Sequence, residues 1–134
     1  MKYASVLLVG SMALLPLGGS YAGDLKDQMK VEIDDAQVHS GMPAGTYVCA
    51  AGHLHVKATV QNLGDETVGT VKVAGKALDA NGKVLGTATA TTRQAQLEPL
   101  DSAPIDMEFK SVTGPLLERV KSEDLAVVSV APKR

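Results

Sequence analysis

Residues 53–87 read HLHVKATVQNLGDETVGTVKVAGKALDANGKVLGT. The opening of this stretch alternates apolar and polar side chains with a period of two, which is typical of a strand with one buried face. The apolar set is Leu54, Val56, Ala58 and Val60, and the polar set is His53, His55, Lys57, Thr59 and Gln61. This alternation predicts a strand over residues 53–61.

Two turn sequences divide the stretch, Asn-Leu-Gly-Asp at 62–65 and Asp-Ala-Asn-Gly at 79–82. In the second turn, the aspartate can accept hydrogen bonds from the backbone that follows it, and the glycine can take the left-handed conformation. The stretch is therefore predicted to form a β-meander of three strands joined by two tight turns, with a positive φ at Gly82.

Further strands are predicted outside the meander, over residues 30–38, 46–49, 105–110 and 125–131. Over 105–110, apolar Ile105, Met107 and Phe109 alternate with polar Asp106, Glu108 and Lys110, which predicts a half-buried strand. A short helix is predicted from Pro115, because proline is accepted in the first turn and Leu116, Leu117 and Val120 share one side. Two prolines between 97 and 104 indicate a turn. Seven short strands with one short helix near the C-terminus predict an all-β fold, an immunoglobulin-like antiparallel β-sandwich.

The N-terminus has the pattern of a secretory signal peptide over residues 1–22. Lys2 is followed by an apolar run over 5–17 and by Ser-Tyr-Ala at 20–22, which places small residues at the positions that a signal peptidase inspects. Pro16 interrupts the run, which is also shorter than the roughly 20 residues that span a bilayer. We expect cleavage before Gly23, a single domain over 23–134, a periplasmic or secreted location, and no stable membrane insertion after cleavage.

Composition argues against several classes of partner. The formal net charge is −2, and Lys2 is the only charged residue of the signal peptide, so no basic face for nucleic acid is expected. Tyr47 and Phe109 are the only aromatic residues after position 22, too few for stacking platforms that would hold single-stranded nucleic acid or sugars.

A set of core and turn residues resembles the FxLYD-type domains of bacterial envelope proteins. The matching residues are Val56, Val60, Asn62, Val71, Val73, the run 78–87, Leu97, Pro99, Ser102 and Phe109. Gly75 and Ala77 stand where that family has bulky apolar residues, and Leu100 replaces a glycine. The resemblance implies an immunoglobulin-like, non-enzymatic module for adhesion, assembly or binding, and it carries no catalytic residues.

No catalytic constellation is found, because no serine sits in a nucleophile elbow and no acidic pair is placed to share a proton. The protein is therefore predicted to be a non-enzymatic interaction or assembly module with no cofactor, whose partner is another envelope protein. The candidate contact surface is the polar face of the predicted strand 53–61, formed by His53, His55, Lys57, Thr59 and Gln61. An ordinary solvated face explains the same pattern.

The alternative prediction is a periplasmic protein that binds copper or zinc through Cys49, His53 and His55. Residues two apart on a strand share a face, and sulfur and imidazole donors suit both metals. The spacing matches no established zinc pattern. Cys49 is the only cysteine, so it is expected to be a buried free thiol, a metal ligand or part of an intermolecular bridge.

Overall fold

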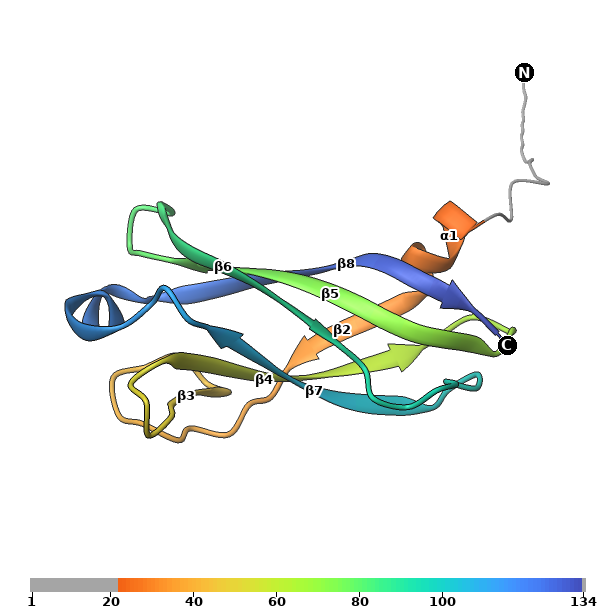
Figure 1. The fold of residues 1–134 in the computed structure, drawn as a ribbon, viewed down its shortest axis with the longest axis horizontal. Helices are drawn as coiled ribbons and strands as arrows, with labels where there is room; N and C mark the ends of the chain where they lie inside the picture. Colours follow the sequence, from red (N-terminus) through yellow and green to blue (C-terminus); the bar gives the residue numbers. More distant parts are fainter. Residues whose placement is uncertain (1–21, 134) are drawn as a thin grey trace, which may run out of the picture.

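In residues 22–133, which the computed structural model describes, seven strands form two antiparallel sheets that pack face to face (Figure 1). The predicted all-β sandwich is thus confirmed. The first sheet is built around β4 (Leu54–Asn62). One edge of β4 pairs with β7 (Ser102–Phe109), and its other edge is shared by β2 (Met29–Ile33) and β3 (Thr46–Val48), which meet different parts of it.

The second sheet has the order β6–β5–β8, with β5 (Val68–Leu78) between β6 (Val84–Thr91) and β8 (Ser122–Pro132). Hence β4 and β5 lie in opposite sheets, and the predicted three-stranded meander is wrong at its first turn. The reason is Asn62, whose buried side chain donates to the carbonyl oxygens of Glu66 and Leu97 and accepts from the Gly64 N–H. These bonds hold the chain as it crosses from one sheet to the other.

The second predicted turn is confirmed as a hairpin between β5 and β6. The Asp79 carboxylate accepts from the backbone N–H groups of Asn81 and Lys83 at 2.8 and 2.9 Å, and Gly82 has a φ of 80°. The Arg119 guanidinium lies 3.4 Å from the same carboxylate. Local turn chemistry therefore fixes this hairpin.

The core lies between the sheets and follows the predicted alternation. The apolar residues of β4 point inward, as do those of β7 and β5. Among the described residues, Phe109 is the largest fully buried side chain, and Met107, two positions earlier in β7, is fully buried as well. A Cβ atom at Gly75 would lie 2.4 Å from Met107 Sδ and 3.2 Å from Phe109 Cζ. Gly75 thus makes room for two large side chains of the opposite sheet.

Several predicted boundaries need correction. β2 ends at Ile33, well before residue 38, and β8 begins at Ser122. β7 includes Pro104, which was assigned to a turn; a proline is tolerated there because β7 is an edge strand with β4 as its single neighbour. The segment before β2 forms the short helix α1 (Ala22–Asp27). The predicted C-terminal helix is present as the 3₁₀-helix η2 (Gly114–Arg119).

The predicted signal peptide and its cleavage site fall almost entirely on residues 1–21, outside the described residues. Within 22–133, no helix combines the length and the apolar composition needed to cross a membrane.

Candidate metal centre

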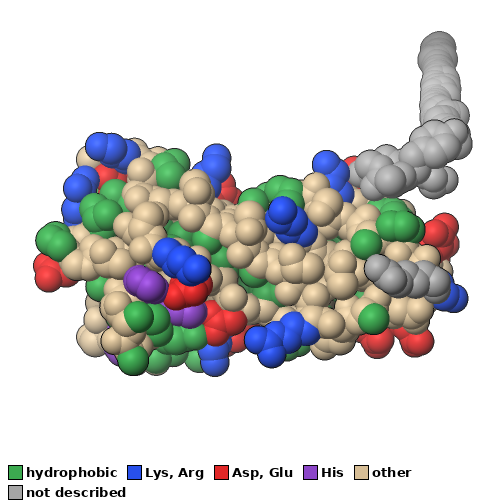
Figure 2. All heavy atoms as spheres, in the orientation of Figure 1, with side chains coloured by type: hydrophobic (Ala, Val, Ile, Leu, Met, Phe, Trp, Pro, Cys, Tyr) green, Lys and Arg blue, Asp and Glu red, His purple; other side chains and the backbone are tan. Residues whose placement is uncertain are grey.

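The outer face of the first sheet carries a polar cluster that draws on three strands. Strand pairing places Tyr47 of β3, His55 of β4 and Glu108 of β7 in one row across the sheet, with Lys57 and Asp106 paired in the next row. Figure 2 shows histidine, acidic and basic side chains side by side at one end of the molecule. The sheet register therefore brings together side chains that are far apart in the sequence.

Cys49 reaches this cluster because β3 and β4 form a short hairpin. The Cys49 N–H donates to the His53 carbonyl oxygen at 3.1 Å, and the Gly52 N–H donates to the Cys49 carbonyl oxygen at 2.9 Å. Gly52 has a φ of 84°, which allows the chain to turn within these few residues. Cys49 is free and only partly buried, so the first of its three expected states, a buried free thiol, is not what the structure shows.

His55 is held in one orientation by its neighbours. Its Nδ1 lies 2.7 Å from Asp106 Oδ1, and the Tyr47 hydroxyl donates to the other oxygen of the same carboxylate. The rings of Tyr47 and His55 stack with their centroids 4.7 Å apart. Burial, followed by the hydrogen bond to Asp106, raises the pKa of Tyr47 to about 12, so the phenol keeps its proton at neutral pH.

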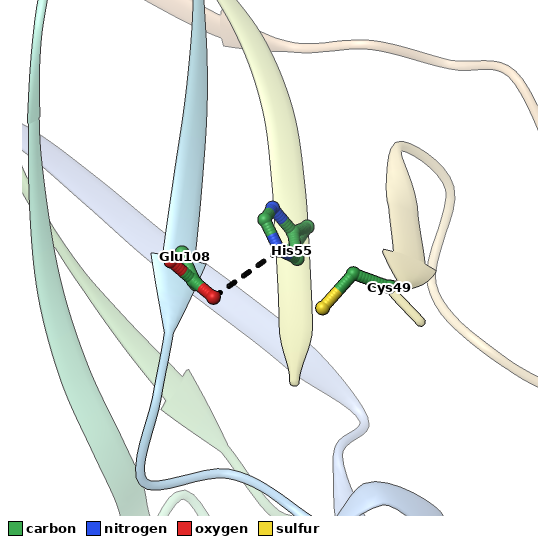
Figure 3. A group of neighbouring side chains, drawn as sticks. All are labelled: Cys49, His55 and Glu108. Carbon is green, nitrogen blue, oxygen red and sulfur yellow. Dashed lines mark ion pairs between the residues drawn. The ribbon is translucent and has the colours of Figure 1, made fainter. Parts of the chain in front are cut away.

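The opposite nitrogen of His55 faces two further donor atoms (Figure 3). Its Nε2 is buried without a hydrogen-bond partner and lies 3.7 Å from Glu108 Oε2. One donor atom each from Cys49, His55 and Glu108 lies within 4.8 Å of the other two. An imidazole nitrogen, a sulfur and a carboxylate oxygen at this separation form a donor set that a transition metal can bridge.

The surroundings lower the pKa of two of the three donors and raise that of the third. A hydrogen bond from the His53 backbone, assisted by His55, lowers the pKa of the Cys49 thiol despite partial desolvation. A hydrogen bond from the His53 side chain likewise lowers the pKa of Glu108. For His55, desolvation acts downward, but the hydrogen bond to Asp106 and the neighbouring Cys49 sulfur outweigh it and raise the pKa, so the imidazole must lose a proton before Nε2 can bind a metal.

The sequence-predicted ligand set is partly brought together. Cys49 and His55 lie in the donor set, whereas His53 does not, because its Nδ1 bonds Glu108 Oε2 at 2.7 Å instead. The predicted contact face also differs in character along its length. Of its five residues, Lys57 alone is exposed, and Gln61 donates to the Leu100 carbonyl oxygen at 3.2 Å.

Sequence reasoning missed Glu108 and Asp106, although both were expected on the outer face of their strand. Their pairing with β4 joins residues about fifty positions apart, and nothing in the local pattern specifies which strand neighbours which. The sequence does indicate that the two carboxylates share a face, because apolar and polar residues alternate over 105–110.

Comparisons with known proteins leave the function open. No protein-family model matches the chain, so the resemblance to FxLYD-type domains gains no support there. No curated protein matches it either. Among solved structures, the chain is similar to IrmA from Escherichia coli, with a TM-score of 0.49, 14% identity and 80% of each chain covered. No functional inference is drawn from a likeness of this degree.

Proposed function

We propose that this chain is an exported, non-enzymatic protein that binds one transition-metal ion, zinc or copper, through Cys49, His55 and Glu108. The observation that carries the proposal is the mutual approach of their donor atoms within 4.8 Å, with His55 Nε2 buried and unpartnered. The signal pattern at the N-terminus supports export to the periplasm or beyond.

The surroundings of the donor set suit a divalent ion. A thiolate and a carboxylate supply two negative charges, and Asp106 presents the His55 imidazole with Nε2 directed at the site. Zinc binds thiolate, imidazole and carboxylate ligands, and three protein ligands leave one position for water or another ligand. The carboxylate oxygen favours zinc over Cu(I), which prefers soft sulfur donors.

Zinc titration of the purified protein against a chromophoric chelator tests the proposal. We expect the wild type to bind one zinc ion per chain. Loss of a residue that only supports a ligand lowers metal affinity by roughly 10- to 100-fold, so Cys49→Ser and Glu108→Gln, which each remove a ligand, should lower zinc affinity by more than that. Glu32→Gln, on an exposed part of β2, is the matched control and keeps wild-type affinity. Wild-type affinity in both ligand variants contradicts the proposal.

The same titration separates the two possible ligand sets. His53→Gln retains a side chain that can donate to Glu108, and we expect at most a small change in zinc affinity. A loss equal to that of Cys49→Ser assigns His53 as a ligand, as the sequence-based alternative has it.

A second candidate function is an interaction module that contacts another envelope protein. Exposed Lys57 favours this function, since its Nζ lies 5.6 Å from the Tyr47 ring centroid and offers a charge beside the polar row. Lys57→Glu with Thr59→Glu changes that face and spares the metal ligands. Loss of a partner from envelope extract, with zinc affinity intact, supports a contact there; an unchanged set of partners removes this face.

A further inference from the structure

The edge of β6 is unusual among the edges of the two sheets. β2, β6, β7 and β8 each pair with a single neighbour among the described strands, and so does the three-residue β3. β2, β7 and β8 carry charged residues, and β7 and β8 also carry a proline. β6 reads VLGTATAT and has neither. Charges and prolines are the usual means of preventing a further strand from pairing with an edge, and β6 lacks both.

The backbone of β6 presents donors to this edge. The Thr92 N–H donates to the Val71 carbonyl oxygen of β5, and antiparallel pairing alternates donor direction along the strand. The N–H groups of Thr87, Thr89 and Thr91 therefore point away from β5. In the described residues, hydrogen bonds to the β6 backbone come from β5 and from no other strand.

A hollow of about 650 Å³ lies beside this edge. Thr89 and Ala90 both line the hollow. Because neighbouring residues on a strand point to opposite faces of the sheet, a hollow that touches both must lie along the edge of β6. β7 packs against β6 and also lines the hollow with two neighbouring residues, Ile105 and Asp106. Ala58, with Ala90 and Ile105, gives it an apolar part.

The rim of the hollow carries three cations that have no ion-pair partner in the described part of the chain. Lys57, Arg93 and Lys110 line it, and none of the three has an ion-pair partner within 4.0 Å among the described residues. The rim also carries three carboxylates, of which Asp106 and Glu108 are engaged by His55 and His53, and the third is Asp34. The three cations are therefore the rim charges that are free to pair with an acidic ligand.

We infer that the β6 edge binds an extended segment of a partner protein as an added strand. Backbone hydrogen bonds would come from the outward N–H groups, and alternate side chains of the segment would enter the hollow. Apolar side chains of the segment would pack in the apolar part of the hollow, and acidic residues at the ends of the segment would pair with the cations at the rim. A second copy of β6 fits poorly, because antiparallel pairing brings Lys83 of one chain near Arg93 of the other.

Two synthetic octapeptides test the inference, EVTVTVTE and its lysine-ended counterpart KVTVTVTK. With metal-free protein, we expect the acidic peptide to bind with a Kd about tenfold or more below that of the basic one, because the rim charges discriminate. Amide hydrogen exchange followed by NMR should be fast at Thr87, Thr89 and Thr91 in the free protein and slow in the complex. Failure of both peptides to bind, or binding without that protection, overturns the inference.

Two kinds of variant complete the test. Thr89→Pro removes one outward donor while β5 keeps its bonds, and we expect it to fold and to weaken peptide binding about tenfold. Arg93→Glu with Lys110→Glu should reverse the preference between the peptides, whereas Lys26→Glu with Lys133→Glu, the same change in net charge elsewhere, should not. If the two charge-reversed double variants show the same preference between the peptides, the inference is overturned, even if Thr89→Pro does not fold. A dimer formed through β6 overturns it as well.

Discussion

His55 Nδ1 of β4 lies 2.7 Å from Asp106 Oδ1 of β7, and this bond determines which way the imidazole can act. An ionised carboxylate only accepts hydrogen bonds, so Nδ1 carries the hydrogen and Nε2 of the neutral ring has the lone pair. That nitrogen is the one that faces Glu108, at 3.7 Å. Histidines that bind metals commonly have such a carboxylate partner on the other nitrogen. Asp106 thus positions a ligand without being one.

The first prediction concerns this positioning. Asp106→Ala should lower zinc affinity by roughly 10- to 100-fold, because His55 loses its orientation while all three donors remain. Tyr47→Phe is the comparison variant: it removes the hydroxyl, which contacts Asp106 and lies 3.2 Å from His55 Nδ1, and it keeps both the Asp106–His55 bond and the aromatic ring against His55. Competition titration measures both. Equal losses in the two variants would mean that the Asp106–His55 bond has no special part in binding.

The second prediction concerns packing at Gly75. Gly75→Ala should lower the free energy of unfolding by about 1–3 kcal/mol, because the new methyl group overlaps Met107 in a filled core. Urea denaturation measures the change. Met107→Val shortens the obstructing side chain, so the double variant should lose less stability than the sum of the two single variants. Strict additivity would show that the two positions do not compete for space.

The third prediction concerns the β5–β6 turn. No atom would lie within 4 Å of a Cβ at Gly82, so its φ of 80° is the only obstacle to a side chain there. Gly82→Val should cost about 1 kcal/mol or more, because a β-branched residue resists the left-handed conformation. Gly82→Asn, which tolerates that conformation, should cost less. Similar melting of the two variants would contradict this assignment.

The fourth prediction concerns acid stability. Hydrogen bonds from the Lys83 and Asn81 backbone, together with Arg119, hold the pKa of Asp79 below its ordinary value despite desolvation. A lowered folded-state pKa stabilises the protein above the unfolded-state pKa, about 3.9 for aspartate, and this contribution is lost as the pH falls through the folded-state value. Wild type should therefore be more stable than Asp79→Asn between about pH 5 and 8, and the difference should shrink below about pH 4. A difference that grows on acidification would contradict it.

Local sequence signals predicted what local chemistry determines. The alternation in β4 and β7 gave the buried faces correctly, and Asp79 with Gly82 gave the hairpin, since each depends on residues close in the chain. The crossing at Asn62 depends on its bond to Leu97, thirty-five residues away, and therefore could not be predicted.

The same limit applies to the candidate site. Cys49 and His55 lie close together in the sequence and were recognised as possible ligands. Glu108 joins them only through the register of β4 with β7, a pairing that the sequence pattern does not specify. His53 was predicted to be a ligand because it shares a face with His55, but its Nδ1 bonds Glu108 and its ring nitrogens are not part of the donor set.

X-ray absorption at the zinc edge tests the metal proposal most directly, because it counts the ligands by element. The account predicts one sulfur ligand at about 2.3 Å, from Cys49, with the remaining nitrogen and oxygen ligands at about 2.0–2.2 Å. In Cys49→Ser, the sulfur contribution should vanish. Protein that retains no zinc after dialysis, or a zinc spectrum without sulfur in the wild type, would contradict the account.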